Sequence, residues 1–564
     1  MLSAMILLGT LLVLILGYAL LGGRLEKAWG LDPKAETPAY DKFDRKDYVS
    51  AAPGILLGHH VASIAGVSVI FAPVLAAKTG WLPALLWCVL GGVLFGAVLD
   101  FGALTASLRE DGKSLGEVLR RFVGLRAQRL YIVHALLVLV LSVAFLTAVA
   151  ADGFASAGAI VTLGEAQVSA AAASGTTAIL FVLLSLLFSF LVYRKNLPMG
   201  AMIVLGVVGI ALCVFGGMNL GLNLPAFVWV ALIAVYAIVA SQLPVWTLLQ
   251  SRDFLSAILL GVMLLLGMVS VVGAAFAGKA AIQVPALGAD WTDGKWSAAL
   301  ALVLAGTGVS GFHALVASGT SAKQLGSEKH AKLIGVGGAL LTVFVSVLAL
   351  LAAATLPGGV DTANPAQNFA LGLATAFAAL LGGDGAAVAS GVVYELWLLA
   401  VTVFAMTSLD TAVRLGRYLF VELFNPEGLR KKEMTPLQKT MTRPLTGALA
   451  VALPGCALGL IPQMRELLPS VAAADLLLAA VCLMAVGIWL GGTRRKAGAV
   501  RALALVLLVL AIADQVLTGV SLGGNVLALV GELLPGGFGL VTAGAILPAL
   551  LRRKKPEEET DTEE

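Results

Sequence analysis

Long apolar runs, separated by short polar connectors, occupy almost the whole chain. About 20 consecutive apolar residues in a helix cross a bilayer, and on that rule the sequence predicts about fifteen membrane spans. The predicted spans are residues 3–22, 54–77, 82–107, 129–150, 176–193, 199–216, 226–248, 254–278, 297–322, 333–356, 386–411, 445–462, 471–493, 501–518 and 525–550. The apolar stretch 366–382 is shorter and predicts a re-entrant or surface helix.

Connectors rich in lysine and arginine alternate, span by span, with connectors almost free of them. The basic connectors are 23–53, 108–128, 194–195, 323–332, 412–444, 494–501 and 552–555. The others are 151–175, 217–225, 357–365 and 519–524. Because short basic loops stay in the cytoplasm, we predict an outside N-terminus, a cytoplasmic C-terminus and an odd number of spans.

The composition is that of a protein embedded in a membrane. Of the 564 residues, 59% are hydrophobic and only 12% are charged, whereas soluble domains carry about 25% charged residues. The formal charge of +4 is too small and too scattered to indicate nucleic-acid binding. The longest polar connectors, 23–53 and 412–444, are too short to form a catalytic domain with its own core.

Sequence motifs also limit the chemistry. The sequence has no G-x-x-x-x-G-K-[ST] motif, so ATP is not the direct energy source, and it has no H-E-x-x-H motif. Its four cysteines have no C-x-x-C spacing. We therefore expect that the protein is not an enzyme and that it binds no cofactor and no metal.

The span at 54–77 combines weak helix points with two histidines. Its weak points are Gly58, the run Ala62–Gly66 and Pro73. A membrane helix can break only where protein or water satisfies the freed backbone groups, and such breaks form the midplane sites of secondary transporters. Small residues also serve close helix packing. The histidines favour a site, because imidazole is costly in lipid and titrates near neutral pH. The candidates for substrate binding or proton coupling here are His59, His60, Ser63 and Gly66.

The span at 297–322 repeats this combination. Glycines 306, 308 and 311 precede His313, and three hydroxyl residues follow it: Ser318, Thr320 and Ser321. Hydroxyls at 318 and 321 share one helical face. Together with backbone carbonyls from a broken neighbouring helix, they would suit Na⁺ or a protonatable site. The alternative is that each hydroxyl bonds to the carbonyl four residues earlier in its own helix.

A third candidate cluster lies at residues 241–255. Gln242, Trp246 and Gln250 are four residues apart, which predicts one polar and aromatic helical face suited to a small polar ligand, although Trp246 could instead anchor the helix at the interface. Pro244 should kink the helix. Arg252 and Asp253 are expected to form a surface pair at the inner end of the span.

Few charged residues lie within the predicted spans. Asp100 and Asp410 lie near the inner ends of their spans, and Arg414 follows Asp410 by one helical turn. That spacing predicts an Asp410–Arg414 pair on one face. We interpret these three residues as a gate or structural latch.

Several of these segments together resemble the carbon starvation protein A family. The matching segments are GHHVASIAGVSVIFAPVLAAKTGWLPALLWCVLGGVLFGAVLDF, DGKSLGE followed by RRFVG, LPVWTLLQSRDFL, SGFHALVASGTSAKQ and TSLDTAVRLGRYL. They occur in order between about residues 46 and 423. One departure falls at the double histidine: the family's usual A-G-A-G-P is Ala65-Gly66-Val67-Ser68-Val69 here, which alters the segment expected to unwind.

The resemblance implies a bacterial inner-membrane importer of peptides or pyruvate, coupled to H⁺. It also implies the leucine-transporter-type fold of the amino acid–polyamine–cation superfamily, an all-α core of two inverted five-helix repeats. On that basis 54–77 and 226–248 are the two unwound core helices, and 297–322 is the eighth. A cation commonly lies between the first and eighth helices of that fold, so the resemblance implies a cation site formed by carbonyls near Ala62 and Ala65 with the hydroxyls that follow His313. The predicted regions are 1–53, a first helix and linker; 54–411, the ten-helix core; 412–444, a cytoplasmic linker; 445–551, four further helices; and 552–564, a disordered charged tail.

The leading hypothesis is therefore a secondary active transporter that imports peptides by alternating access with H⁺. The alternatives are a symporter of pyruvate with H⁺ or Na⁺, and a membrane receptor that binds a nutrient without moving it. A small-molecule or peptide substrate and membrane lipid are the expected partners. A receptor would show saturable binding without accumulation, which distinguishes it from a transporter.

Overall fold

The structure is a computed structural model that describes most of the chain. Outside the described residues lie 156–159, 164–165, 196, 292, 294, 306–307, 362–363, 382–384, 494, 522–525 and 553–564. The predicted charged tail 552–564 therefore lies almost entirely outside the described residues.

The described chain is nearly all helical. Its α-helices are α1 (Leu2–Leu16), α2 (Gly23–Ala28), α3 (Pro38–Asp41), α4 (Pro53–Ile64), α5 (Val67–Ala76), α6 (Trp81–Leu86), α7 (Ala97–Leu108), α8 (Leu115–Phe122), α9 (Leu125–Ala155), α10 (Ala170–Lys195), α11 (Met199–Leu220), α12 (Ala226–Gln242), α13 (Leu249–Phe276), α14 (Trp296–Ala305), α15 (Gly311–Val316), α16 (Ala322–Gln324), α17 (Gly338–Ala354), α18 (Pro365–Leu381), α19 (Gly385–Phe424), α20 (Pro436–Met441), α21 (Pro444–Gly459), α22 (Leu468–Gly492), α23 (Gly498–Ser521) and α24 (Val526–Leu551). One antiparallel hairpin joins β1 (Ile160–Leu163) to β2 (Ala166–Ser169).

Several membrane helices continue through short π-helical segments. These segments are Gly17–Gly22, Trp87–Gly96, Ala317–Ser321 and Leu333–Gly337. Short 3₁₀ turns lie at Ala77–Thr79, Ala289–Trp291, Glu328–His330 and Pro462–Leu467. π-Helical turns are frequent at functional sites, and the segment Ala317–Ser321 contains the three hydroxyl residues that follow His313.

The helices confirm an all-α polytopic membrane protein. Among the described residues, 11 helices are long and apolar enough to cross a membrane, and α4 with α5 makes a further span bent by 48°. Three shorter apolar helices are α12, α18 and α21. Every predicted span coincides with one of these helices or with the α14–α16 series, while the total of fifteen crossings stays a prediction.

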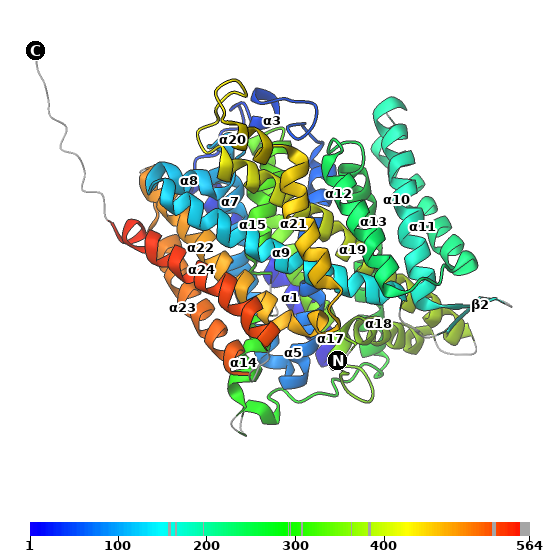
Figure 1. The fold of residues 1–564 in the computed structure, drawn as a ribbon. Coiled ribbons are helices and arrows are strands. Elements are labelled where there is room, and N and C mark those ends of the chain that lie inside the picture. The colour runs from blue at the N-terminus through cyan, green and yellow to red at the C-terminus, as the bar shows by residue number, and fades with distance from the viewer. Residues whose placement is uncertain are drawn as a thin grey trace, which may run out of the picture.

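The central helices pack around α4, α5 and α15. α4 lies against α13, α5 against α17, and α15 against α22. The long α9 packs against α19 and α21 and crosses the molecule in Figure 1. α22 is the most enclosed of the 11 long helices, because 89% of the residues in its apolar segment are buried. α23 and α24 cover its outer side.

The second broken span differs from the one expected. α12 is an unbroken helix that packs on α9, α19 and α21. Pro244 follows its end at Gln242, where a missing N–H removes no helical hydrogen bond, so the expected unwinding of 226–248 is wrong. Instead α14 ends at Ala305 and α15 begins at Gly311. The glycine-rich segment of 297–322 supplies this second break.

Candidate functional site

The first helix break lies at Ala65 and Gly66, within the predicted weak run. Gly66 has an extended backbone with ψ −176°, and α5 starts at Val67 in a new direction. A Cβ atom on Gly66 would lie 2.7 Å from the Ser408 hydroxyl of α19. Any other side chain here would push α19 away, which explains the glycine.

The second break is held open by hydrogen bonds at the start of α15. The Ser310 side chain accepts a hydrogen bond from the His313 backbone N–H at 3.2 Å. Asp475 on α22 accepts one from the Phe312 backbone N–H at 2.7 Å. These two side chains replace the helical partners that the first amides of a helix lack.

Both breaks face one cavity of about 60 Å³, here called the central cavity. Its polar lining comes from Ser68, Ser142, Ser310, His313, Ser408 and Asp475. Val67 and Ser68, the first residues of α5, also line it, and α5 has no side-chain cap. The amino-terminal end of α5, which carries the positive end of the helix dipole, therefore lines the cavity, and this end favours an anion.

His313 also connects the cavity to a buried carboxylate behind it. Its Nδ1 lies 3.5 Å from Oδ2 of Asp100 on α7, and both side chains are at most 2% exposed. The two carboxylate oxygens of Asp100 have no hydrogen-bond partner among the described residues. An intramembrane carboxylate placed in this way is a candidate functional group, and its interpretation as part of a gate or latch stays a prediction.

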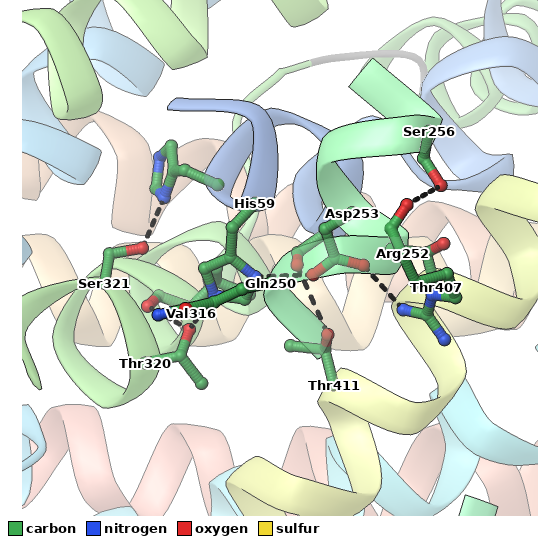
Figure 2. A network of polar contacts seen from close by, with 12 residues as sticks. His59, Gln250, Arg252, Asp253, Ser256, Val316, Thr320, Ser321, Thr407 and Thr411 are labelled. Atoms are coloured by element: carbon green, nitrogen blue, oxygen red, sulfur yellow. Dashed lines mark hydrogen bonds and ion pairs between the residues drawn. The ribbon is translucent and has the colours of Figure 1, made fainter. Parts of the chain in front are cut away.

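The two neighbouring histidines point to different partners. His59 Nδ1 lies 2.6 Å from Asp253 Oδ2 on α13, and its Nε2 lies 3.1 Å from the Thr320 hydroxyl. His60 Nδ1 lies 2.9 Å from the Ser321 hydroxyl. Figure 2 shows His59 directed at Asp253 and Thr320. Each imidazole thus tethers α4 to the segment that follows the second break.

Asp253 belongs to a chain of buried charges that runs from α4 to α19. Arg252 contacts Asp253 at 2.7 Å and both oxygens of Asp410, at 2.5 and 3.0 Å. Tyr236 donates a hydrogen bond to Asp410 at 3.2 Å. We call His59, Asp253, Arg252 and Asp410 the buried ion-pair network. Figure 2 labels the first three of these residues.

Two predicted pairings are corrected by this network. Arg252 and Asp253 do pair, but they are 1% and 0% exposed, because the start of α13 lies between α4 and α19 and not at the surface. Asp410 does not pair with Arg414, because Arg252 occupies both of its oxygens. Arg414 instead bonds Asp47 at 3.2 Å.

Asp47, in the linker before α4, bonds two arginines and a tyrosine of α19. It accepts hydrogen bonds from Arg417 at 2.6 Å and from the Tyr418 hydroxyl at 2.9 Å, besides the contact with Arg414. Burial alone would raise its pKa, but Arg417 and Arg414 outweigh burial and hold the pKa of Asp47 below its usual value. The linker is thus fastened to α19.

Comparison with known proteins identifies the family. The chain matches the family "Carbon starvation protein CstA" over residues 2–364 and 357–514. It belongs to the CstA family. The family resemblance seen in the sequence motifs is therefore confirmed.

Named relatives within the CstA family include carriers of two kinds of substrate. The pyruvate/proton symporter BtsT of Escherichia coli K12 is 32% identical over 64% of this chain and 50% of its own length. The peptide transporter CstA of the same strain is 32% identical over 58% and 47%, and that of Bacillus subtilis 168 is 28% identical over 77% and 76%. The chain spans about half the length of the relatives it matches first.

Two solved structures have a similar arrangement of their chain. MhsT in complex with L-phenylalanine has a TM-score of 0.49 at 15% identity, covering 90% of this chain and 99% of its own. The manganese transporter of Eremococcus coleocola has a TM-score of 0.47 at 13% identity, covering 90% and 98%.

The predicted cation ligands of this CstA-family chain make other bonds. The Ser318 hydroxyl donates to the Ala314 carbonyl at 2.7 Å and Thr320 to Val316 at 3.1 Å, which is the within-helix alternative. Ser321 faces His60. Ala62 and Ala65 are fully buried at the end of α4.

Sequence reasoning missed the hydroxyls that do face the first break. Ser408 donates to the Ser63 carbonyl at 2.9 Å, and the Thr411 and Ser63 hydroxyls are 3.2 Å apart. The signal was present, because Ser408 and Thr411 are three residues apart on one helical face. The sequence interpretation instead assigned this part of the helix to a latch, on the basis of the charged Asp410 that lies between these two residues.

The predicted face of Gln242, Trp246 and Gln250 does not form. The helix ends at Gln242, so the three side chains diverge. Trp246 donates to the Arg45 carbonyl at 3.2 Å, and Gln250 donates to the Gln324 side chain at 2.7 Å in the interior. None of the three lines the central cavity.

Proposed function

We propose that this CstA-family protein is a secondary active transporter that imports a small carboxylate together with H⁺ by alternating access. The observation that carries the proposal is the central cavity, where two broken helices meet beside buried titratable groups. Broken helices around a midplane cavity are the usual binding sites of secondary transporters. The cation-rich linker side would face the cytoplasm of a bacterial inner membrane.

The cavity's chemistry and size support a small carboxylate. The uncapped start of α5 and His313 of α15 both line the cavity, and an anion can accept hydrogen bonds from backbone N–H groups and from an imidazole N–H. A volume of 60 Å³ holds about four to six water-sized groups. Pyruvate, with about six non-hydrogen atoms, is of comparable size. The relative named as a pyruvate/proton symporter supports the same substrate class.

The buried ion-pair network supports proton coupling and a gate. Asp253 is shared between His59 and Arg252, so the charge on His59 decides how strongly α4 is held to α13. A charged imidazole would hold Asp253 more tightly than a neutral one, which can still donate its Nδ1–H. Because the network lies between the central cavity and the linker, we assign it the role of closing the cytoplasmic side.

Peptide import is the second candidate. Several relatives are named peptide transporters, but the central cavity as it stands is too small for a dipeptide. A peptide would require the two broken helices to separate. Under this proposal the ten-helix inverted-repeat core is retained as a hypothesis, with α14–α16 in place of α12 as the second broken helix.

Uptake into proteoliposomes tests the proposal. Purified protein is reconstituted, and radiolabelled pyruvate and radiolabelled dialanine are supplied with an inward proton gradient, with and without a protonophore. The proposal expects gradient-dependent accumulation of pyruvate. Accumulation of dialanine alone would favour the second candidate, whereas saturable binding without accumulation of either would favour a receptor and contradict transport.

A further inference from the structure

A second and larger cavity lies next to the linker, here called the linker cavity. Its volume is about 330 Å³, and its lining includes Lys46, Tyr48, Gln128, Lys323, Arg417 and Tyr418. It shares no lining residue with the central cavity. Along α19, Ser408 of the central cavity and Arg417 of the linker cavity are nine residues apart, which is about 14 Å.

Most charges that line the linker cavity already have partners. Arg417 bonds Asp47 at 2.6 Å, and Lys113 lies 3.7 Å from Glu117. The Lys323 ammonium donates to two backbone carbonyls and lies over the rings of Tyr48 and Tyr418. These bonds fix the walls of the cavity and leave those groups little need of a ligand.

Lys46 is different, because its ammonium has no carboxylate within ion-pair distance among the described residues. It is half-buried in the linker, and burial together with the nearby Arg417 lowers its pKa from the usual value. The lining thus carries four cations against three carboxylates, Asp47, Glu117 and Glu422. One positive charge is left for an anionic ligand.

Gln128, at the start of α9, provides the second observation. Its side chain is 1% exposed, lines the cavity, and leaves both its amide nitrogen and its amide oxygen without a hydrogen-bond partner in the described chain. A buried amide in this state costs free energy until something bonds to it. It offers a ligand one donor and one acceptor at the same place.

We propose that the linker cavity is a second binding site, for a small organic carboxylate that carries a keto or hydroxyl oxygen. The carboxylate neutralises Lys46, and the Gln128 amide bonds to the carboxylate and to the neighbouring oxygen. The rings of Tyr48 and Tyr418 flank the ligand's carbon atoms. This site is separate from the substrate site of the proposed transport cycle.

Chemical footprinting of lysines tests the site without any transport assay. Purified protein is acetylated with a trace of acetic anhydride in the presence of pyruvate, L-lactate or inorganic phosphate, and each lysine is read by mass spectrometry. The exposed Lys34 of the same linker is the internal control. A charge-assisted hydrogen bond is worth about a tenfold change in occupancy, so we expect both carboxylates to slow acetylation of Lys46 by about that factor.

Two variants separate this site from the central cavity. Gln128→Leu should abolish the protection of Lys46, whereas Ser68→Leu, which obstructs the central cavity at an exposed position, should leave it unchanged. If Gln128→Leu does not fold, equilibrium dialysis of Lys46→Gln against Lys34→Gln replaces it, and only Lys46→Gln should lose one bound carboxylate per chain. Absence of protection, equal protection by phosphate, or loss of protection in Ser68→Leu would each overturn the proposal.

Discussion

Removing the charge of Asp410 should unlock the buried ion-pair network. Arg252 is 1% exposed and uses both of its terminal nitrogens on Asp410, at 2.5 and 3.0 Å. In Asp410→Asn the shape of the side chain is kept, but the guanidinium loses its main counter-charge in a dry environment. Breaking one side of a buried pair costs about 3–5 kcal/mol. Because Asp253 still contacts Arg252 at 2.7 Å, we expect the lower end, about 3 kcal/mol.

Unfolding of the purified protein by SDS in mixed micelles measures this loss. Asp41→Asn is the control, because the pair of Asp41 with Lys42 is exposed and such pairs contribute about 0–1 kcal/mol. The double variant Arg252→Gln with Asp410→Asn should recover part of the loss, because no unpaired guanidinium remains. An Asp410→Asn protein within about 1 kcal/mol of wild type, or strictly additive variants, would refute this assignment of the network.

Three further predictions follow from the same geometry. His59→Gln should abolish gradient-driven pyruvate accumulation while pyruvate exchange across proteoliposomes continues; retention of gradient-driven accumulation would contradict proton coupling at this residue. Gly66→Ala should lower unfolding free energy by about 1–3 kcal/mol in the SDS assay, because its new methyl group overlaps a facing serine hydroxyl. The control Gly200→Ala should leave the unfolding free energy without this loss, because open space surrounds Gly200. The pKa of Asp47 is lower in the folded protein than in the unfolded chain, so its contribution to stability is complete above about pH 4 and is lost as the pH falls through the folded pKa. The difference in melting temperature between wild type and Asp47→Asn should therefore shrink below about pH 4. A difference that stays constant with pH would count against the pair with Arg417.

The sequence predicts the helices of this protein well because membrane spans are set by local composition. A stretch of about 20 apolar residues has only one stable backbone state in lipid, so the position of each span follows from hydropathy alone. The break at Gly66 was predictable because the run Ala62–Gly66 weakens the helix, and the preceding histidines place that helix against protein or water.

The pairing of buried charges could not be predicted from spacing. Asp410 and Arg414 are correctly spaced for a pair within α19, yet Arg252 from another helix competes for Asp410 with two bonds at short range. Such a choice depends on which helices meet, and one chain's hydropathy does not contain that information. The predicted helical face of Gln242, Trp246 and Gln250 is wrong for another reason. The helix ends before Pro244, so residues four apart no longer share a face.

The most direct test of the central cavity uses a cysteine at its entrance. Ser68 lines the cavity and is exposed, while all four native cysteines are buried. In Ser68→Cys protein, the rate of reaction with a membrane-impermeant maleimide is measured in the presence and absence of pyruvate. If the substrate binds between the two broken helices, pyruvate slows the reaction. L-Lactate then slows it only to the extent that the protein also transports L-lactate. Equal rates with and without pyruvate, in protein that still transports it, would place the substrate elsewhere and contradict the account.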